Sequence, residues 1–153
     1  AFKACQYLVE FGYNPEAALI YNLAYPKLLS DSGTTISSYH SFEKVKHTFE
    51  LWARSSSLFE TSEKVLSTID GINFDTDGTD NLFNHEVLSS FKANLLIEFG
   101  QGLIDQKKWT DFDLLIEKAR KESLGSSVLE FKLHVNAITQ SLKSRDKIRA
   151  NRY

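Results

Sequence analysis

Residues 99–119 read FGQGLIDQKKWTDFDLLIEKA, and their apolar side chains recur at helical spacing on both sides of a short polar turn. Two apolar stripes with three- and four-residue steps predict two antiparallel helices that face each other, joined at Lys107 and Lys108. The first stripe consists of Leu96, Phe99 and Leu103, and the second of Trp109, Phe112, Ile116 and Ala119. We therefore expect a helical hairpin in which Trp109 and Phe112 are buried.

Two glycines lie inside the first helix of this predicted hairpin. Gly100 and Gly102 should each cost helix stability, by about 1 kcal/mol relative to alanine. The presence of both glycines in one helix indicates that a neighbouring helix approaches closely. The bulky ring of Phe112 would hold the two helices apart unless the glycines on the facing helix make room for it.

The pattern of residues 99–119 resembles one repeat of the tetratricopeptide (TPR) family. In that family a large residue, a glycine and another large residue precede a turn, and an aromatic residue opens the second helix. A small, a large and a small residue follow at four-residue steps, although here Phe112 occupies the first small position. An ordinary antiparallel helix pair within a bundle explains the same stripes and stays open as the alternative.

A single hairpin cannot bury its apolar face, so the resemblance implies further repeats. The small-residue position held by Phe112 is matched by Ala17 and Ser62, at spacings of 45 and 50 residues that exceed the family's typical value of about 34. The middle copy matches the family only in the helical spacing of its large side chains. The N-terminal copy comprises Cys5, Leu8, Gly12, Ala17, Tyr21 and Ala24, and the middle copy comprises Phe49, Ala53, Phe59, Leu66 and Ile69.

The chain of 153 residues is predicted to form one all-α domain, and we expect it to be a segment of a longer protein. No stretch alternates as a strand would, so at least about 60% helix and no sheet are expected. The resemblance implies antiparallel hairpins stacked as a right-handed solenoid, over residues of about 2–29, 38–70 and 84–122. The seven helices are expected at residues 2–11, 15–29, 38–55, 58–70, 84–105, 110–122 and 127–148.

The last predicted helix, 127–148, would cap the stack or continue it. Two helix starts carry a capping-box pattern, Ser57 with Glu60 and Ser127 with Glu130. We expect the last helix to pack on the preceding hairpin through one apolar face. That face comprises Val128, Phe131, Val135, Ile138 and Leu142.

Composition excludes several classes of protein. A hydrophobic content of 42% with 25% charged residues is ordinary for a folded domain and unlike a disordered chain. No run of 18 apolar residues is present, so no membrane span is expected. The lone Cys5 cannot form an internal disulfide, which favours an intracellular location, cytoplasmic or nuclear.

One acidic loop partly matches a calcium-binding pattern. Asn73, Asp75 and Asp77 alternate ahead of Gly78, as oxygen ligands do in an EF-hand loop. The twelfth position holds Asn84 in place of the bidentate glutamate. A solvated linker, in which Asp and Asn favour turns, is the preferred interpretation.

No catalytic arrangement is evident, and we expect a protein that is not an enzyme and needs no cofactor. The four histidines never form a metal-binding pair at three- or four-residue spacing. No glycine-rich phosphate loop follows a strand, because Gly100 and Gly102 lie within a predicted helix.

The whole chain has a net charge of −2. Residues 143–153 at its C-terminal end form the only basic patch in the sequence. Helix-end cations that complement the helix dipole are the simpler explanation, and contact with phosphate is the alternative. A helical domain that associates with nucleic acid is thus a second hypothesis, although an ion- or ligand-binding bundle also stays open. The basic residues are Lys143, Arg145, Lys147, Arg149 and Arg152.

The TPR resemblance implies a scaffold that binds another protein or a peptide, within a larger intracellular assembly. In that family, inward-facing positions of the first helix of each hairpin contact the ligand. The opposite charges of Arg54 and Asp105 would give such a groove an internal polarity. The corresponding positions here are Gln6, Glu10, His47, Arg54, Asn94, Gln101 and Asp105.

Overall fold

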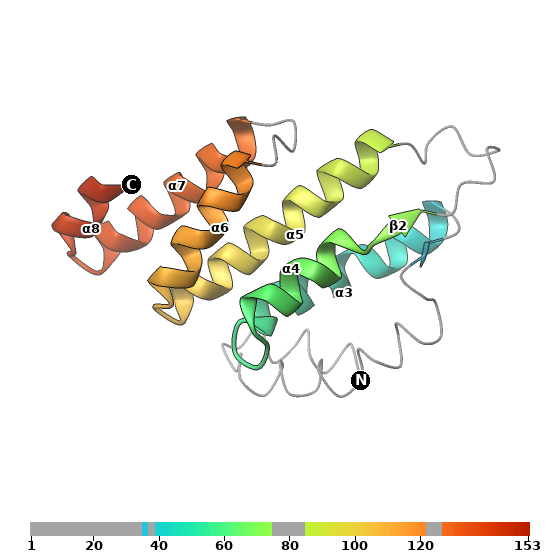
Figure 1. Cartoon of the computed structure of the whole chain (residues 1–153), viewed down its shortest axis with the longest axis horizontal. Coiled ribbons are helices and arrows are strands. Elements are labelled where there is room, and N and C mark those ends of the chain that lie inside the picture. Colours follow the sequence, from blue (N-terminus) through green and yellow to red (C-terminus); the bar gives the residue numbers. More distant parts are fainter. Residues whose placement is uncertain (1–34, 37–38, 75–84, 122–126) are drawn as a thin grey trace.

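The computed structural model describes residues 35–36, 39–74, 85–121 and 127–153 (Figure 1). This part of the chain contains six α-helices and two strands of two residues each, so the predicted helical class is confirmed. The predicted helices 2–11 and 15–29 lie outside the described residues. The helices are α3 (Tyr39–Ser56), α4 (Ser62–Asp70), α5 (His85–Asp105), α6 (Trp109–Lys121), α7 (Ser127–Lys143) and α8 (Lys147–Arg152).

α5 is the centre of the packing. It contacts α3, α4, α6 and α7, and Figure 1 shows these helices side by side, with α3 and α4 at one end and α7 and α8 at the other. Phe112 of α6 is fully buried against α5, as predicted. Trp109 is only partly buried, which corrects its prediction. The core residues of α5 are Phe91, Leu95, Leu96, Phe99, Leu103 and Ile104.

A short strand pairing corrects the expectation of no sheet. β1 (Thr35–Ile36) and β2 (Asn73–Phe74) run parallel, with Thr35 opposite Asn73 and Ile36 opposite Phe74. β1 precedes α3 and β2 follows α4, so this pairing joins the two ends of the α3–α4 unit. Strands of two residues are too short to show the alternation by which a sequence reveals a strand.

The two glycines of α5 face different neighbours. A Cβ atom on Gly100 would lie 2.6 Å from Leu133 Cδ2 and 3.3 Å from Phe112 Cε2. A Cβ atom on Gly102 would overlap the backbone carbonyl of Arg54, whose carbon would lie 3.0 Å away. The predicted close approach is confirmed: Gly100 makes room for side chains of α6 and α7, and Gly102 lets the backbones of α3 and α5 meet.

The helix predicted over residues 127–148 is interrupted, because the chain turns after Lys143. Arg145 has a φ of 59°, and the Asp146 amide donates to the Ser141 carbonyl, which together form a Schellman-type helix end. Asp146 then caps α8 by accepting a hydrogen bond from the Arg149 amide at 3.0 Å. The α5–α6 turn has the same geometry, with Lys107 at a φ of 58°. α8 contributes no buried residue.

The helix start predicted at Ser57 with Glu60 is also wrong. The Ser57 hydroxyl donates back to the Arg54 carbonyl at 3.3 Å, so it does not cap a new helix. α4 begins at Ser62 instead, where Thr61 accepts a hydrogen bond from the Lys64 amide. α7 begins at Ser127, where the sequence predicts a helix start, and the Ser127 side chain lies outside the described ones.

The face through which α7 was expected to pack is turned outward. α7 contacts α5 and α6 through its opposite side, where Leu129, Leu133 and Ala137 are buried. The missing side chain of Gly100 leaves space that Leu133 fills, and the small side chain of Ala137 also allows close packing on this side. The exposed fractions on the outward face are 53% for Val128, 67% for Phe131, 40% for Val135 and 58% for Leu142.

Candidate functional site

Three residues predicted to line a peptide groove, Arg54, Gln101 and Asp105, meet between α3 and α5. The Arg54 guanidinium lies 3.3 Å from the Asp105 carboxylate and 3.8 Å from that of Glu98. Gln101 Nε2 donates to Asp105 Oδ1 at 2.8 Å. The opposite charges therefore satisfy each other across the two helices.

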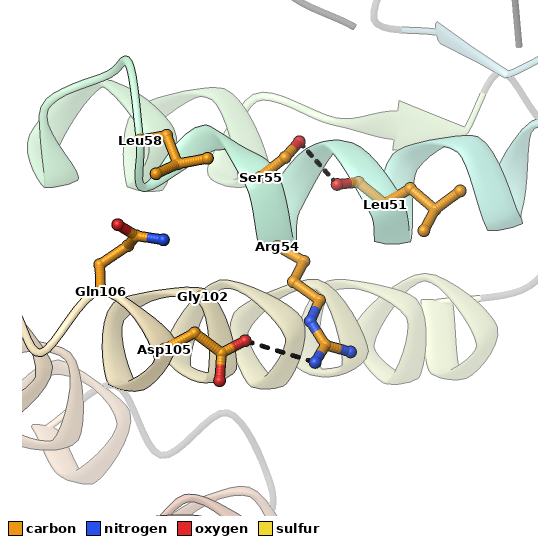
Figure 2. A pocket seen from close by; sticks show the side chains of 7 residues that line it. All are labelled: Leu51, Arg54, Ser55, Leu58, Gly102, Asp105 and Gln106. Atoms are coloured by element: carbon orange, nitrogen blue, oxygen red, sulfur yellow. Dashed lines mark hydrogen bonds and ion pairs between the residues drawn. The ribbon is translucent and has the colours of Figure 1, made fainter. Parts of the chain in front are cut away.

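The pocket at this position is small. Figure 2 shows Arg54 reaching from α3 toward Asp105 on α5. The enclosed volume of ≈ 20 Å³ is room for about one water molecule. A small-molecule site is not formed here. The lining residues are Leu51, Arg54, Ser55, Leu58, Gly102, Asp105 and Gln106.

Of the remaining predicted groove residues, only Asn94 has a described side chain, and it does not line this pocket. Asn94 lies half-buried in α5, two helical turns before Gln101. His47 lies in α3, and its side chain is not described. Gln6 and Glu10 lie outside the described residues.

Arg54→Ala is expected to lower the free energy of unfolding by less than about 1 kcal/mol, because exposed ion pairs contribute little. The Arg54 side chain is 44% exposed where it meets Asp105. Urea denaturation of the two proteins measures the difference. A loss of several kcal/mol would show that this pair is a main link between α3 and α5.

Two cations of the basic segment fix the C-terminal residues against α6. The Arg149 guanidinium lies 4.4 Å from the centre of the Trp109 ring, and Arg152 forms an ion pair with Asp113. The Tyr153 hydroxyl also donates to Asp113, and burial together with this carboxylate raises the pKa of the phenol.

The other three cations of the segment, Lys143, Arg145 and Lys147, are exposed. They have no ion-pair partner among the described residues. The basic segment is therefore divided between cations that hold α8 and cations that face solvent.

The possible calcium loop is described only at its beginning, where Asn73 lies in β2. Asp75 and Asp77 lie outside the described residues. Within the described ranges, no group of three His, Cys, Asp or Glu side chains is placed to hold a metal ion. None of the helices described combines the length and apolar character needed to cross a membrane.

The outward face of α7 is the most distinctive surface of the described residues, and we call it the α7 stripe. Its members follow one another at steps of three, four, three and four residues. This is the spacing of the a and d positions of a coiled-coil heptad. The α7 stripe comprises Val128, Phe131, Val135, Ile138 and Leu142.

A concavity of ≈ 390 Å³, open to solvent, runs beside the α7 stripe. Glu130 on its edge is paired with Arg120 at 2.7 Å, and the hydrogen bond from Arg120 lowers the pKa of the Glu130 carboxyl. His134 Nε2 lies 3.5 Å from the same carboxylate. The concavity is lined by Glu130, Phe131, His134, Val135, Ile138 and Tyr153.

Sequence reasoning found the residues of the α7 stripe but assigned them to the core. The signal that separates the two possibilities is a second apolar stripe in the same helix, Leu129, Leu133 and Ala137. A helix with apolar residues on opposite sides packs on two neighbours. Described residues cover only one of these sides.

Comparison with models of known families, with characterised proteins and with solved structures finds no match. The fold class shown is an all-helical one, and function is inferred from the surface of the described residues.

Proposed function

We propose that this chain is a TPR-like helical scaffold that binds another protein and performs no chemistry of its own. The observation that carries the proposal is the α7 stripe, in which four large apolar side chains are 40–67% exposed on one helix. A contiguous apolar patch of this kind is typical of a protein interaction site.

The packing of the helices supports a solenoid of hairpins. α5 contacts α3 on one side and α7 on the other, as the first helices of successive hairpins do in a stack. The Schellman turns at Lys107 and Arg145 give α5–α6 and α7–α8 the same connection. In such a stack the α7 stripe is the surface on which a further helix would pack.

The experiment is an affinity capture from cell lysate with the wild-type chain and with the double variant Phe131→Ser, Leu142→Ser. The double variant should lose its main bound protein while keeping its melting temperature, because both side chains are exposed. Leu114→Ser is the matched control, since Leu114 is 55% exposed on α6, outside the stripe.

Arg54→Ala in the same capture tests the groove between α3 and α5. If this variant loses the bound protein and the α7 double variant retains it, the protein binds at the groove and not at the α7 stripe. If every variant retains the bound protein, neither the α7 stripe nor the groove is the binding surface. A capture that falls steeply with salt and vanishes after nuclease treatment would favour the nucleic-acid hypothesis.

A further inference from the structure

The α7 stripe has the dimensions and the spacing of a helix-binding seam. From Val128 to Leu142 it extends over about 21 Å, or four helical turns. The alternation of three- and four-residue steps places all five side chains in one line along α7, which is the spacing through which two helices pack against each other. The open concavity beside Phe131 and Val135 provides room for side chains of that helix.

Charge around the stripe is positive. Lys132 occupies the heptad position next to Phe131, and it is exposed with no ion-pair partner in the described part of the chain. Lys143, Arg145 and Lys147 lie at the C-terminal end of the stripe. Two described carboxylates lie near the stripe and both are paired, Glu130 with Arg120 and Asp146 with Arg149. Cations beside a heptad seam select partners with acidic residues at the facing positions.

A second copy of the chain fits this surface poorly. A parallel pair of α7 helices would place Lys143, Arg145 and Lys147 beside the same residues of the other copy. An antiparallel pair would direct them at the N-terminal end of the other α7, which is the positive end of the helix dipole. Both arrangements bring like charges together.

We propose that the α7 stripe binds an amphipathic helix of a partner protein, which carries apolar residues at heptad spacing and acidic residues flanking them. This inference rests on the proposed function and specifies the chemistry of its partner. The apolar seam supplies the contact area, and Lys132 with the C-terminal cations sets the preference for acidic flanks.

The test uses two synthetic helical peptides of equal length. Both have Leu and Ile at their a and d positions, and one has Glu at e and g where its twin has Lys. Fluorescence anisotropy with the full chain should show the Glu peptide binding at least about tenfold more tightly at low salt. The difference should shrink at high salt, because the charges are exposed to solvent.

Two variants separate the apolar contribution from the electrostatic one. Phe131→Ser should abolish binding of the Glu peptide, and the control Leu114→Ser should leave it unchanged. The double variant Lys132→Glu, Lys143→Glu should reverse the preference, so that the Lys peptide binds more tightly. Unchanged melting temperatures would show that each variant is folded.

Three outcomes would overturn the inference. They are equal binding of the two peptides, binding of neither, and a dimer of the chain in analytical ultracentrifugation that Phe131→Ser dissociates. If neither peptide binds while lysate capture still depends on Phe131 and Leu142, the proposed function stands and the acidic-helix partner is wrong. If capture is also independent of these residues, both fail.

Discussion

Gly102→Ala is expected to lower the free energy of unfolding by about 2–3 kcal/mol, although alanine favours helix by about 1 kcal/mol. The new methyl group would overlap the backbone carbonyl of Arg54 and lie 2.8 Å from Ser57 Oγ. A backbone group cannot rotate away, so α3 and α5 would have to separate. Urea denaturation followed by circular dichroism measures the change.

Gly100→Ala is the matched control on the same helix. There the added methyl group meets the ends of flexible side chains, with Leu133 Cδ2 at 2.6 Å and Leu115 Cδ2 at 3.1 Å. Rotation of these leucines relieves part of the overlap, and the gain in helix propensity offsets part of the rest. A cost for Gly100→Ala as large as that for Gly102→Ala would contradict the difference between backbone and side-chain contact.

Phe112→Ala is expected to lower the free energy of unfolding by about 3–5 kcal/mol, because it leaves a cavity in the core. The Phe112 ring is fully buried over Gly100, and its centre lies 6.1 Å from that of Trp109 and 5.7 Å from that of Tyr153. Removing the ring therefore also weakens the attachment of the C-terminal residues to α6.

Leu114→Ala serves as the reference for Phe112→Ala, since Leu114 lies on the outer side of α6 and is 55% exposed. Its effect should stay within about 0.5 kcal/mol, as for most surface substitutions. Chemical denaturation of both variants gives the comparison. Equal effects would mean that Phe112 is not at the centre of the hairpin.

The hairpin of α5 and α6 could be predicted because its signals agree. Apolar residues at helical spacing, a polar turn and two glycines all indicate the same pair of helices. Phe112 could be placed next to a glycine because its size demanded the space. The helix that packs on Gly102 could not be predicted. Gly102 contacts the backbone of α3, and a backbone contact does not depend on which side chains α3 carries.

The orientation of α7 could not be predicted, because this helix has an apolar stripe on each side. From the sequence, the face with Phe131 and Leu142 is the one expected to be buried, because its side chains are larger. Burying a larger apolar side chain contributes more to the stability of the fold. Packing instead followed shape, since Leu133 fills the space left by Gly100. The break before α8 was missed because Arg145 adopts a left-handed conformation that usually calls for glycine.

Of the candidate groove residues, Arg54, Gln101 and Asp105 could be brought together from the family pattern. Gln101 and Asp105 lie one turn apart on α5, so their hydrogen bond follows from helical spacing. The contact of Arg54 with Asp105 could not be predicted, because it depends on the distance between α3 and α5. That distance is set by Gly102.

Because α8 has no buried residue, surface contacts such as those of Arg149 with Trp109 and Arg152 with Asp113 are what resist its local opening. In an assembly held by contacts between neighbours, the free energy of opening rises from the outer units toward the middle. Amide protons of α8 should thus exchange with deuterated solvent long before those of α5. A helix docked along α7 would also stabilise the packing of α8 on α7, and slower exchange in α8 would then report the binding of a partner on the neighbouring helix.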